Sequence, residues 1–487
     1  MKKKLFVFLI PIVLIIISLF PRKENKELVS NTDNLVSFTV DGVESKTMPT
    51  KGSGYIANKI TCKNGSIITF DNDNYIIEVE KLESADACKI DFSKEIGSNT
   101  VTVTISNRSK IDSTSKTTTE GGKVVFYLTG EPESITGGEY TLSSNKLIVN
   151  NIISNINLNI TMSKTLYDQL LIDNSRIKER TKFNITFTET NTGTLYKATE
   201  SIAGNTPKDV YYFAGDAKNN WVKFGGFYWR IIRTNYDGSI RLLYSGTSHN
   251  TTEGYIGKSA FNSTFKDPMY VGYMYGTSGS LDSNRTNTNN STIKTYIDNW
   301  YNNNLSSYSK YISTEAVYCN DRELAQGSTY KTGNTTFDYA PRGRLDTNKT
   351  PAYNCTNIKD AFSGSNSEAK LTYPIGLMTA DEVAYAGGKA FTNLPSPYAW
   401  YYLNSAGGSI TGSTYWYSLS PIYWYGSFSW VWGVAGSDNT GYLGRNDVLG
   451  SLAVRPAISL KFCIKYSTGN GAPETPYEIV LDPDISC

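Results

Sequence analysis

The stretch that most restricts the fold lies near the C-terminus, where residues 415–434 run YWYSLSPIYWYGSFSWVWGV. It contains four of the eight Trp residues of this 487-residue chain and no charged residue. So many rings must either fill a core or form a contact surface. The Gly and Ser between them are also typical of binding surfaces built from Tyr and Trp. The stretch therefore predicts a C-terminal domain whose rings are shared between a core and a display surface.

Positions in and after this stretch divide into two sets. One set recurs at short intervals and is suited to a buried framework: Trp416, Ser420–Pro421, Gly426, Val431–Trp432, Val434, Gly441, Leu443, Val448 and Val454–Pro456. The other set shares no trend in size or polarity, as core positions normally do. It is predicted to bind a ligand: Ile422, Tyr423, Tyr425, Phe428, Trp430, Gly433, Ala435, Tyr442, Gly444, Leu449 and Leu452. The alternative that all these aromatics are core stays open.

The N-terminus indicates export. Lys2–Lys4 precede an apolar run from Leu5 to Phe20, which predicts a signal peptide or an uncleaved membrane anchor over residues 1–21. Both alternatives leave the remainder outside the cell, where it would be extracellular, at the cell surface or membrane-anchored. The net charge of +2 gives no electrostatic argument for a nucleic-acid partner. The only predicted membrane contact is the N-terminal segment, if it is uncleaved.

Six cysteines fit an oxidising compartment: Cys62, Cys88, Cys319, Cys355, Cys463 and Cys487. None forms a C-x-x-C pair, which argues against zinc and thioredoxin-type sites. Sequential pairing is favoured among the possible connectivities, because each bridge would then close a loop within one segment. Buried free thiols are the alternative.

The chain divides into segments of different texture. Short β-branched runs such as KITC, SIITF and YIIEVEKL, separated by turns, predict a disulfide-stapled β module over residues 35–105. Further strands predict a second β-rich module, or stalk, over 106–205, in which residues 165–180 form a helix. A ligand-binding domain is expected over 206–465 and a C-terminal tail over 466–487.

The expected ligand-binding domain mixes strands, helices and long loops. FYWRIIRTNYDGSIRLLY predicts a hairpin, and Ile293, Ile297 and Tyr301 follow a helical period. TADEVAYAGG predicts a helix that begins after Thr379, with Glu382 as its capping-box partner. The fold class is therefore α+β.

Sequence patterns of catalytic chemistry are missing. His249 is the only His and lies in a polar stretch, so a loop position is expected and a multi-His metal site is impossible. No phosphate-binding loop or nucleophile elbow occurs. Asp381–Glu382 are better explained by the helix cap than by carboxylate catalysis, and DNDN at residues 71–74 by a turn than by a calcium loop. We expect no enzymatic activity, no cofactor and no metal.

Several segments carry a family resemblance. YWYSLSP and VRPAISLK, together with the upstream segments STEAVYCNDRE, TNKTPAYNCTN and LTYPIGLMTADEVAYAGG, resemble the variable proteins of diversity-generating retroelements, which are common in gut Gram-positive bacteria. The resemblance covers residues 211–465 and implies a C-type-lectin-like domain, here preceded by small immunoglobulin-like β modules. It implies no sugar chemistry, since the calcium signatures of calcium-dependent lectins are missing.

The resemblance also implies diversification at NNY codons, which cannot encode Lys, Glu, Gln, Met or Trp. Residues 422–452 contain no Lys, Glu, Gln or Met, in agreement, whereas Trp430 departs from the scheme. The expected function is an exported surface protein that displays this domain for adhesion or recognition of a protein or surface glycan. Two alternatives remain: a non-diversified structural surface protein, and a formylglycine-generating-type enzyme. The enzyme would require free thiols at Cys319 and Cys355.

Overall fold

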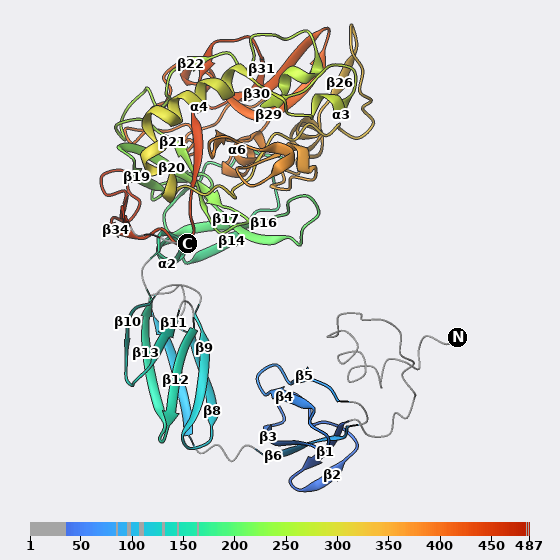
Figure 1. Cartoon of the computed structure of the whole chain (residues 1–487). Helices are drawn as coiled ribbons and strands as arrows, with labels where there is room; N and C mark the ends of the chain where they lie inside the picture. Colours follow the sequence, from blue (N-terminus) through green and yellow to red (C-terminus); the bar gives the residue numbers. More distant parts are fainter. Residues whose placement is uncertain are drawn as a thin grey trace. The chain divides into compact units, whose positions relative to one another are not determined.

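The computed structural model describes residues 36–83, 86–94, 99–106, 112–128, 132–143, 146–162, 165–483, 485 and 487. The expected signal or anchor over 1–21 lies outside these residues. The chain separates into two compact units, of which the first ends at Ile160 and the second begins at Thr161. Each unit is described by itself below (Figure 1).

The first unit begins with a small sheet in the order β2-β1-β6-β3 and a separate β4-β5 hairpin. Phe38, Ile90 and Phe92 form its core together with the hairpin. The runs predicted from β-branched residues are all strands here: β1 (Val36–Val40), β2 (Val43–Ser45), β3 (Tyr55–Cys62), β4 (Ile67–Asp71), β5 (Ile76–Lys81) and β6 (Cys88–Lys94). Asp71 accepts from the backbone N–H groups of Asp73 and Asn74, so this segment is the expected turn.

Two further sheets complete the first unit, in the orders β10-β13-β7-β8 and β11-β12-β9. Their strands are β7 (Asn99–Ser106), β8 (Asp112–Thr118), β9 (Gly122–Tyr127), β10 (Pro132–Thr136), β11 (Thr141–Ser143), β12 (Lys146–Ile152) and β13 (Ile156–Met162). Since β7 pairs with β8, the boundary expected between residues 105 and 106 falls inside a strand pair. The first module therefore ends near Lys94.

The second unit contains a ten-stranded sheet with the path β14-β16-β17-β20-β19-β35-β34, while β21, β33 and β28 extend it from β20. Its strands are β14 (Arg176–Glu179), β16 (Thr194–Glu200), β17 (Lys208–Tyr212), β19 (Trp221–Phe224), β20 (Phe227–Thr234), β21 (Ile240–Tyr244), β28 (Ile375–Leu377), β33 (Pro456–Leu460), β34 (Tyr466–Thr468) and β35 (Tyr477–Ile479). The hairpin predicted over 227–244 is β20–β21.

This sheet corrects two expected boundaries. β16 pairs with β17 across the boundary expected at residues 205 and 206, and the supposed tail supplies β34 and β35. Both segments therefore belong to the second unit. The expected helix over 165–180 is also shorter, because α2 (Leu166–Asp173) is followed by β14. Leu166 and Leu170 are the buried residues of α2.

A second sheet has the order β22-β32-β29-β30-β31, with β26 also paired to β29. It consists of β22 (Lys258–Ser259), β26 (Thr336–Asp338), β29 (Trp416–Tyr425), β30 (Phe428–Val434), β31 (Leu443–Asp447) and β32 (Leu452–Ala453). Smaller pairs are β15 (Thr190–Asn191) with β18 (Asp216–Ala217), β23 (Met274–Tyr275) with β24 (Asn289–Asn290), and β25 (Tyr318–Cys319) with β27 (Ala361–Phe362).

Two helices pack into the same core as both sheets. Ile293 and Ile297 of α4 (Thr292–Asn304) and Val383 of α6 (Ala380–Ala386) join one hydrophobic cluster with residues of the two sheets, such as Ile231 and Trp416. The capping box of Thr379 and Glu382 is present on α6, as predicted. Shorter helical elements are α3 (Leu281–Asn284), α5 (Ala340–Arg342), η1 (Pro268–Val271), η2 (Ser306–Tyr311), η3 (Gly343–Asn348), η4 (Ile358–Asp360), η5 (Ser367–Ala369) and η6 (Ser437–Asn439). The mixture of strands and helices, with strands predominating, agrees with the α+β expectation.

The six cysteines form three sequential disulfides: Cys62–Cys88, Cys319–Cys355 and Cys463–Cys487. This is the pairing that the sequence favours. The first bridge joins residues that face each other on β3 and β6. Three bridges indicate folding in an oxidising, extracellular environment. Among the described residues, no helix has the length and apolar character needed to cross a bilayer.

Removing the Cys319–Cys355 bridge should lower the stability of the second unit. The two residues are 36 positions apart, so a loop of this size predicts a loss of about 3–4 kcal/mol of unfolding free energy. The measurement is urea unfolding of the full chain with both residues changed to Ser, followed by tryptophan fluorescence. All eight Trp lie after residue 220, so this signal reports on the second unit. Reactive thiols in the untreated native protein would contradict the pairing.

Candidate functional site

The aromatic stretch forms the β29–β30 hairpin. Its loop is the two-residue turn Gly426–Ser427, and both residues have positive φ, at 57° and 75°. Such a turn matches the twist of the strands and brings Tyr425 opposite Phe428. Tyr423 lies opposite Trp430 on the same face, with ring centroids 5.8 Å apart. The hairpin therefore gathers four rings on one face, near its tip.

The predicted framework is buried beneath and beside these rings. Trp416, Trp432, Val434 and Val454 are each at most 1% exposed, and the remaining framework positions are buried except Gly426, which lies in the exposed turn. Trp432 contacts the Phe391 ring, with centroids 5.3 Å apart. Its burial identifies this ring as part of the core rather than of a contact surface.

The predicted ligand-binding residues differ widely in exposure. Tyr425, Phe428 and Leu449 are exposed, at 60%, 39% and 39%. Trp430, Tyr442 and Leu452 are half-buried. The other five are buried: Ile422, Tyr423, Gly433, Ala435 and Gly444. The structure thus gives six of the eleven predicted residues access to a partner.

The expected exposure of the five buried residues is wrong for local reasons. A side chain at Gly433 would place its Cβ 2.3 Å from the Asn446 amide, and one at Gly444 would lie 2.2 Å from the Tyr442 ring. At both positions a Cβ would force the neighbouring side chain to move, and at Gly433 it would also lie 2.9 Å from the Trp416 carbonyl oxygen. Tyr423 is only 3% exposed, because the Arg342 guanidinium covers its ring at 4.9 Å. Ile422 and Ala435 face the core.

Three residues beside the rings were missed by sequence reasoning. Arg445 of β31 donates from Nη1 to the Tyr423 hydroxyl at 3.0 Å and lies 5.7 Å from the Trp430 ring. Phe265 stacks on Phe428 with centroids 4.5 Å apart. Arg445 lies in the sequence between the predicted framework positions Leu443 and Val448, so its charge could have indicated an exposed position beside the framework. Arg342 and Phe265 come from distant segments, and no local pattern connects them with the hairpin.

We call the group formed by Arg342, Tyr425, Phe428, Trp430 and Arg445 the hairpin surface. Arg445 is exposed, whereas Trp430 Nε1 is buried and has no hydrogen-bond partner among the described residues, so Trp430 offers its ring and Arg445 offers the donors. Aromatic faces with nearby guanidinium groups can stack on apolar groups and donate to polar ones. Such a surface suits binding by contact area and hydrogen bonds, without bond-making chemistry.

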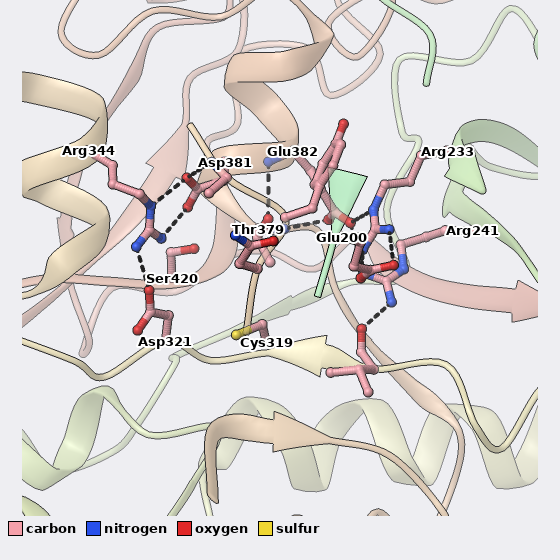
Figure 2. A pocket seen from close by; sticks show the side chains of 14 residues that line it. Glu200, Arg233, Arg241, Cys319, Asp321, Arg344, Thr379, Asp381, Glu382 and Ser420 are labelled. Carbon is pink, nitrogen blue, oxygen red and sulfur yellow. Dashed lines mark hydrogen bonds and ion pairs between the residues drawn. The ribbon is translucent and has the colours of Figure 1, made fainter. Parts of the chain in front are cut away.

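A second candidate is a pocket in the core of the same unit, lined by ion pairs (Figure 2). Arg233 of β20 contacts Glu200 at 2.9 Å and Glu382 at 2.8 Å, and Arg241 of β21 contacts the same Glu382 oxygen at 2.8 Å. Figure 2 also shows Arg344 between two carboxylates, Asp321 at 2.7 Å and Asp381 at 2.9 Å. We call these seven residues the buried ion-pair network.

The ionisation of this network fits a structural role. Burial opposes the charge of Glu382, but Arg241 and Arg233 outweigh it and lower the pKa of the carboxyl. Burial raises the pKa of Asp321, although Arg344 acts against this shift. Cys319 lines the pocket but is bonded to Cys355, so the thiols required by the enzyme interpretation are not free. Every charged side chain that lines the pocket has an ion-pair partner.

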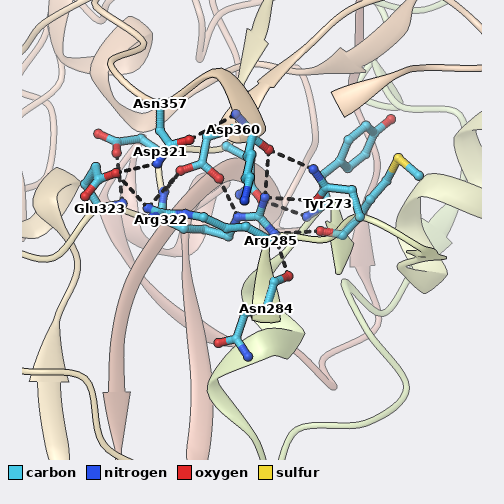
Figure 3. A network of polar contacts seen from close by, with 12 residues as sticks. Tyr273, Asn284, Arg285, Asp321, Arg322, Glu323, Asn357 and Asp360 are labelled. Carbon is cyan, nitrogen blue, oxygen red and sulfur yellow. Dashed lines mark hydrogen bonds and ion pairs between the residues drawn. The ribbon is translucent and has the colours of Figure 1, made fainter. Parts of the chain in front are cut away.

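A neighbouring network fixes the loops on either side of that disulfide (Figure 3). Asp360 accepts from Arg322 Nε at 2.6 Å and contacts Arg285 Nη2 at 3.0 Å, while Glu323 contacts the same Arg285 nitrogen at 3.1 Å. Asn357 donates to Glu323 at 2.9 Å. These contacts stabilise segments that sequence patterns left as loops, and the paired charges give no reactive group.

The remaining sequence candidates have ordinary surroundings. His249 is half-buried in a loop, with Nδ1 2.6 Å from the Ser405 hydroxyl. Among the described residues, one group has metal-ligand spacing, but it consists of the Cys62–Cys88 disulfide and Asp86. Comparison of the chain with protein-family models, curated proteins and solved structures finds no match. The hairpin surface is therefore the feature of the described residues that is best suited to contact a partner.

Proposed function

We propose that the chain is an exported surface protein whose second unit binds a ligand through the hairpin surface. The observation that carries this proposal is the contrast within one hairpin. Tyr425 and Phe428 are exposed, whereas Trp416, Trp424 and Trp432 on the same two strands are fully buried. Exposed neighbouring rings on a rigid, well-packed base lose little conformational freedom on binding. The three disulfides support a location outside the cell.

The resemblance to variable proteins of diversity-generating retroelements supports the same use of this segment. Under this proposal the second unit has a C-type-lectin-like fold, and the sheets of the first unit are immunoglobulin-like modules that serve as a stalk. Diversified ligand contacts would then be concentrated at five of the six accessible positions, Tyr425, Phe428, Tyr442, Leu449 and Leu452, because Trp430 does not fit the codon scheme. A reverse-transcriptase gene beside the locus, with a near-copy of the coding stretch that differs at adenines, tests the diversification.

The proposed ligand is a protein or a surface glycan, and the role is adhesion or recognition. Aromatic faces stack on the apolar faces of sugars and on side chains alike, and the exposed Arg445 supplies donors to either class. The bonded Cys319 and Cys355 speak against the enzyme alternative, which needs both thiols.

Binding should depend on the exposed rings. The experiment is a screen of the labelled full chain against arrays of glycans and of cell-surface proteins. For any ligand found, Tyr425→Ala or Phe428→Ala should weaken binding by about 2 kcal/mol, because central aromatic anchors carry most of the affinity of an interface. Phe462→Ala is the matched control, since Phe462 is 52% exposed in the same unit but outside the hairpin. Equal binding by all variants would contradict the hairpin surface as the binding site, whereas no ligand on either array would favour the structural alternative.

A further inference from the structure

Arg230 of β20 is a buried cation that has no direct ion-pair partner among the described residues. The residue is 2% exposed, and its guanidinium donates to three neutral acceptors: Asn220 Oδ1 at 2.5 Å, the Ala217 carbonyl at 3.0 Å and the Leu403 carbonyl at 3.4 Å. Within the described part of the chain, no carboxylate forms an ion pair with it. A guanidinium has five N–H donors, so two of them have no acceptor in these contacts. The acceptors in direct contact are uncharged, so the guanidinium has no ion-pair partner among the described residues, although the Asp216 carboxylate attracts it from a longer distance.

The groups around Arg230 increase the cost of burying its charge. The Trp221 ring lies 4.2 Å from the guanidinium and the Trp400 ring 5.5 Å away, so water is largely replaced by indole. Burial, followed by repulsion from Arg455, lowers the pKa of Arg230 to about 9, although the Asp216 carboxylate acts against this shift, and Arg230 is still charged at neutral pH. Arg455 is also fully buried, and its guanidinium donates to the carbonyls of Tyr244, Gly254 and Tyr401 and to the Ser245 hydroxyl. Buried charges in proteins are normally paired, because an unpaired one is costly.

A pocket lies directly beside Arg230. It has a volume of about 70 Å³ and is also lined by Asp216, Lys218, Trp221 and Ser405. This space is large enough for several water molecules or for an organic ion of about three or four non-hydrogen atoms. The Lys218 side chain is 52% exposed and Gly407 at the rim is exposed, so the pocket is open to solvent. A small solute can therefore reach the guanidinium.

The charge on the pocket walls selects the ligand. Lys218 Nζ contacts Asp216 Oδ2 at 2.7 Å, and the same oxygen accepts from the Thr190 hydroxyl at 2.9 Å. These two opposite charges offset each other, so the net charge of the pocket is the single positive charge of Arg230. A monoanion balances it, whereas a dianion would leave one negative charge uncompensated in so small a space. A planar carboxylate also matches the two parallel N–H groups of a guanidinium.

We propose that the Arg230 pocket is a binding site for a small carboxylate, separate from the hairpin surface. The carboxylate accepts from the spare N–H groups of Arg230, and Lys218 lies close enough to the pocket to add a second donor. The hydrocarbon part of the ligand packs against the Trp221 ring. The same chemistry is offered by a free organic acid or by the C-terminal carboxylate of a peptide.

The test is a titration of the full chain with sodium acetate at constant ionic strength, maintained with sodium chloride. Acetate should raise the Tm of the second unit with a saturable dependence, as a ligand of the native state does. Lys218→Met should weaken acetate binding at least fivefold, and Asp216→Asn should strengthen it several-fold. Lys223→Met is the matched control, since Lys223 is comparably exposed and ion-paired, to Glu478, outside the pocket. It should bind acetate like the wild type.

Opposite changes in acetate affinity in Lys218→Met and Asp216→Asn support the site. Arg230 itself is left unchanged in this test, because a substitution such as Arg230→Lys can prevent folding. The proposal would be overturned if the Tm followed ionic strength alone, or if the pocket variants responded to acetate like the wild type. Acetate would then be an adventitious ion only. A tripeptide and its C-terminal amide separate the two sources. Binding of the peptide acid but not the amide indicates a peptide terminus, and binding of acetate alone indicates a free acid.

Discussion

Trp432→Ala should lower the unfolding free energy of the second unit by about 3–5 kcal/mol, as expected for loss of a large buried ring. Trp432 is fully buried on β30 and packs against Phe391. Its indole N–H has no hydrogen-bond partner among the described residues, so the loss comes from packing and from the cavity left behind. Urea unfolding of the full chain, followed by tryptophan fluorescence, measures the effect in this unit.

The matched variant is Tyr425→Ala, on the neighbouring strand of the same hairpin. Tyr425 is 60% exposed, and exposed substitutions usually change stability by less than about 0.5 kcal/mol. The difference between the two variants separates framework from display. A Tyr425→Ala chain that loses as much stability as Trp432→Ala would show that the hairpin tip is also structural.

Glu382→Gln should destabilise the second unit by a similar amount, about 3–5 kcal/mol. The carboxylate is 1% exposed and is shared by Arg233 and Arg241, so its neutralisation leaves Arg233 with Glu200 alone and removes the carboxylate that pairs with Arg241. Gln keeps the size of the side chain and can still serve the capping box with Thr379. The variant therefore isolates the charge from the cap. The control is Glu478→Gln, whose exposed pair with Lys223 should contribute less than about 1 kcal/mol.

The difference in unfolding free energy between the wild type and Glu382→Gln should depend on pH in a defined direction. Because the folded pKa of Glu382 is lowered, its charge stabilises the fold fully above the unfolded pKa, near 4.3. That contribution is lost as the pH falls through the folded pKa. The stability gap between the wild type and Glu382→Gln should thus be constant above about pH 5 and shrink below it. A gap that widens in acid would contradict the assigned role of the ion pairs.

Local signals in the sequence were sufficient for most individual elements. β-Branched runs predicted the strands of the first unit, and the Thr379–Glu382 spacing predicted the start of α6, because alternation and capping are properties of neighbouring residues. Unit boundaries were less accessible. The pairing of β16 with β17 and of β19 with β35 joins segments that sequence texture had separated, since strand partners leave no mark on either strand alone.

The candidate site shows the same division. Regular spacing identified Trp416, Trp432 and Val434 as framework, and all three are buried. The lack of a common size or polarity among the predicted ligand-binding positions was a weaker indicator of exposure, because five of the eleven are buried. Tyr423 is covered by Arg342, and Gly433 has no room for a Cβ beside Asn446. Both effects depend on partners that only the folded chain brings close.

The binding claim is tested most directly by measuring Kd and unfolding free energy together for three chains: wild type, Tyr425→Ala and Phe462→Ala. The ligand is the strongest one found on the arrays. The account predicts that Tyr425→Ala binds about thirtyfold more weakly, corresponding to about 2 kcal/mol, while its stability stays within about 0.5 kcal/mol of the wild type. Phe462→Ala should match the wild type in both quantities. A stable Tyr425→Ala chain with unchanged Kd would contradict the assignment of the hairpin surface as the ligand-binding site.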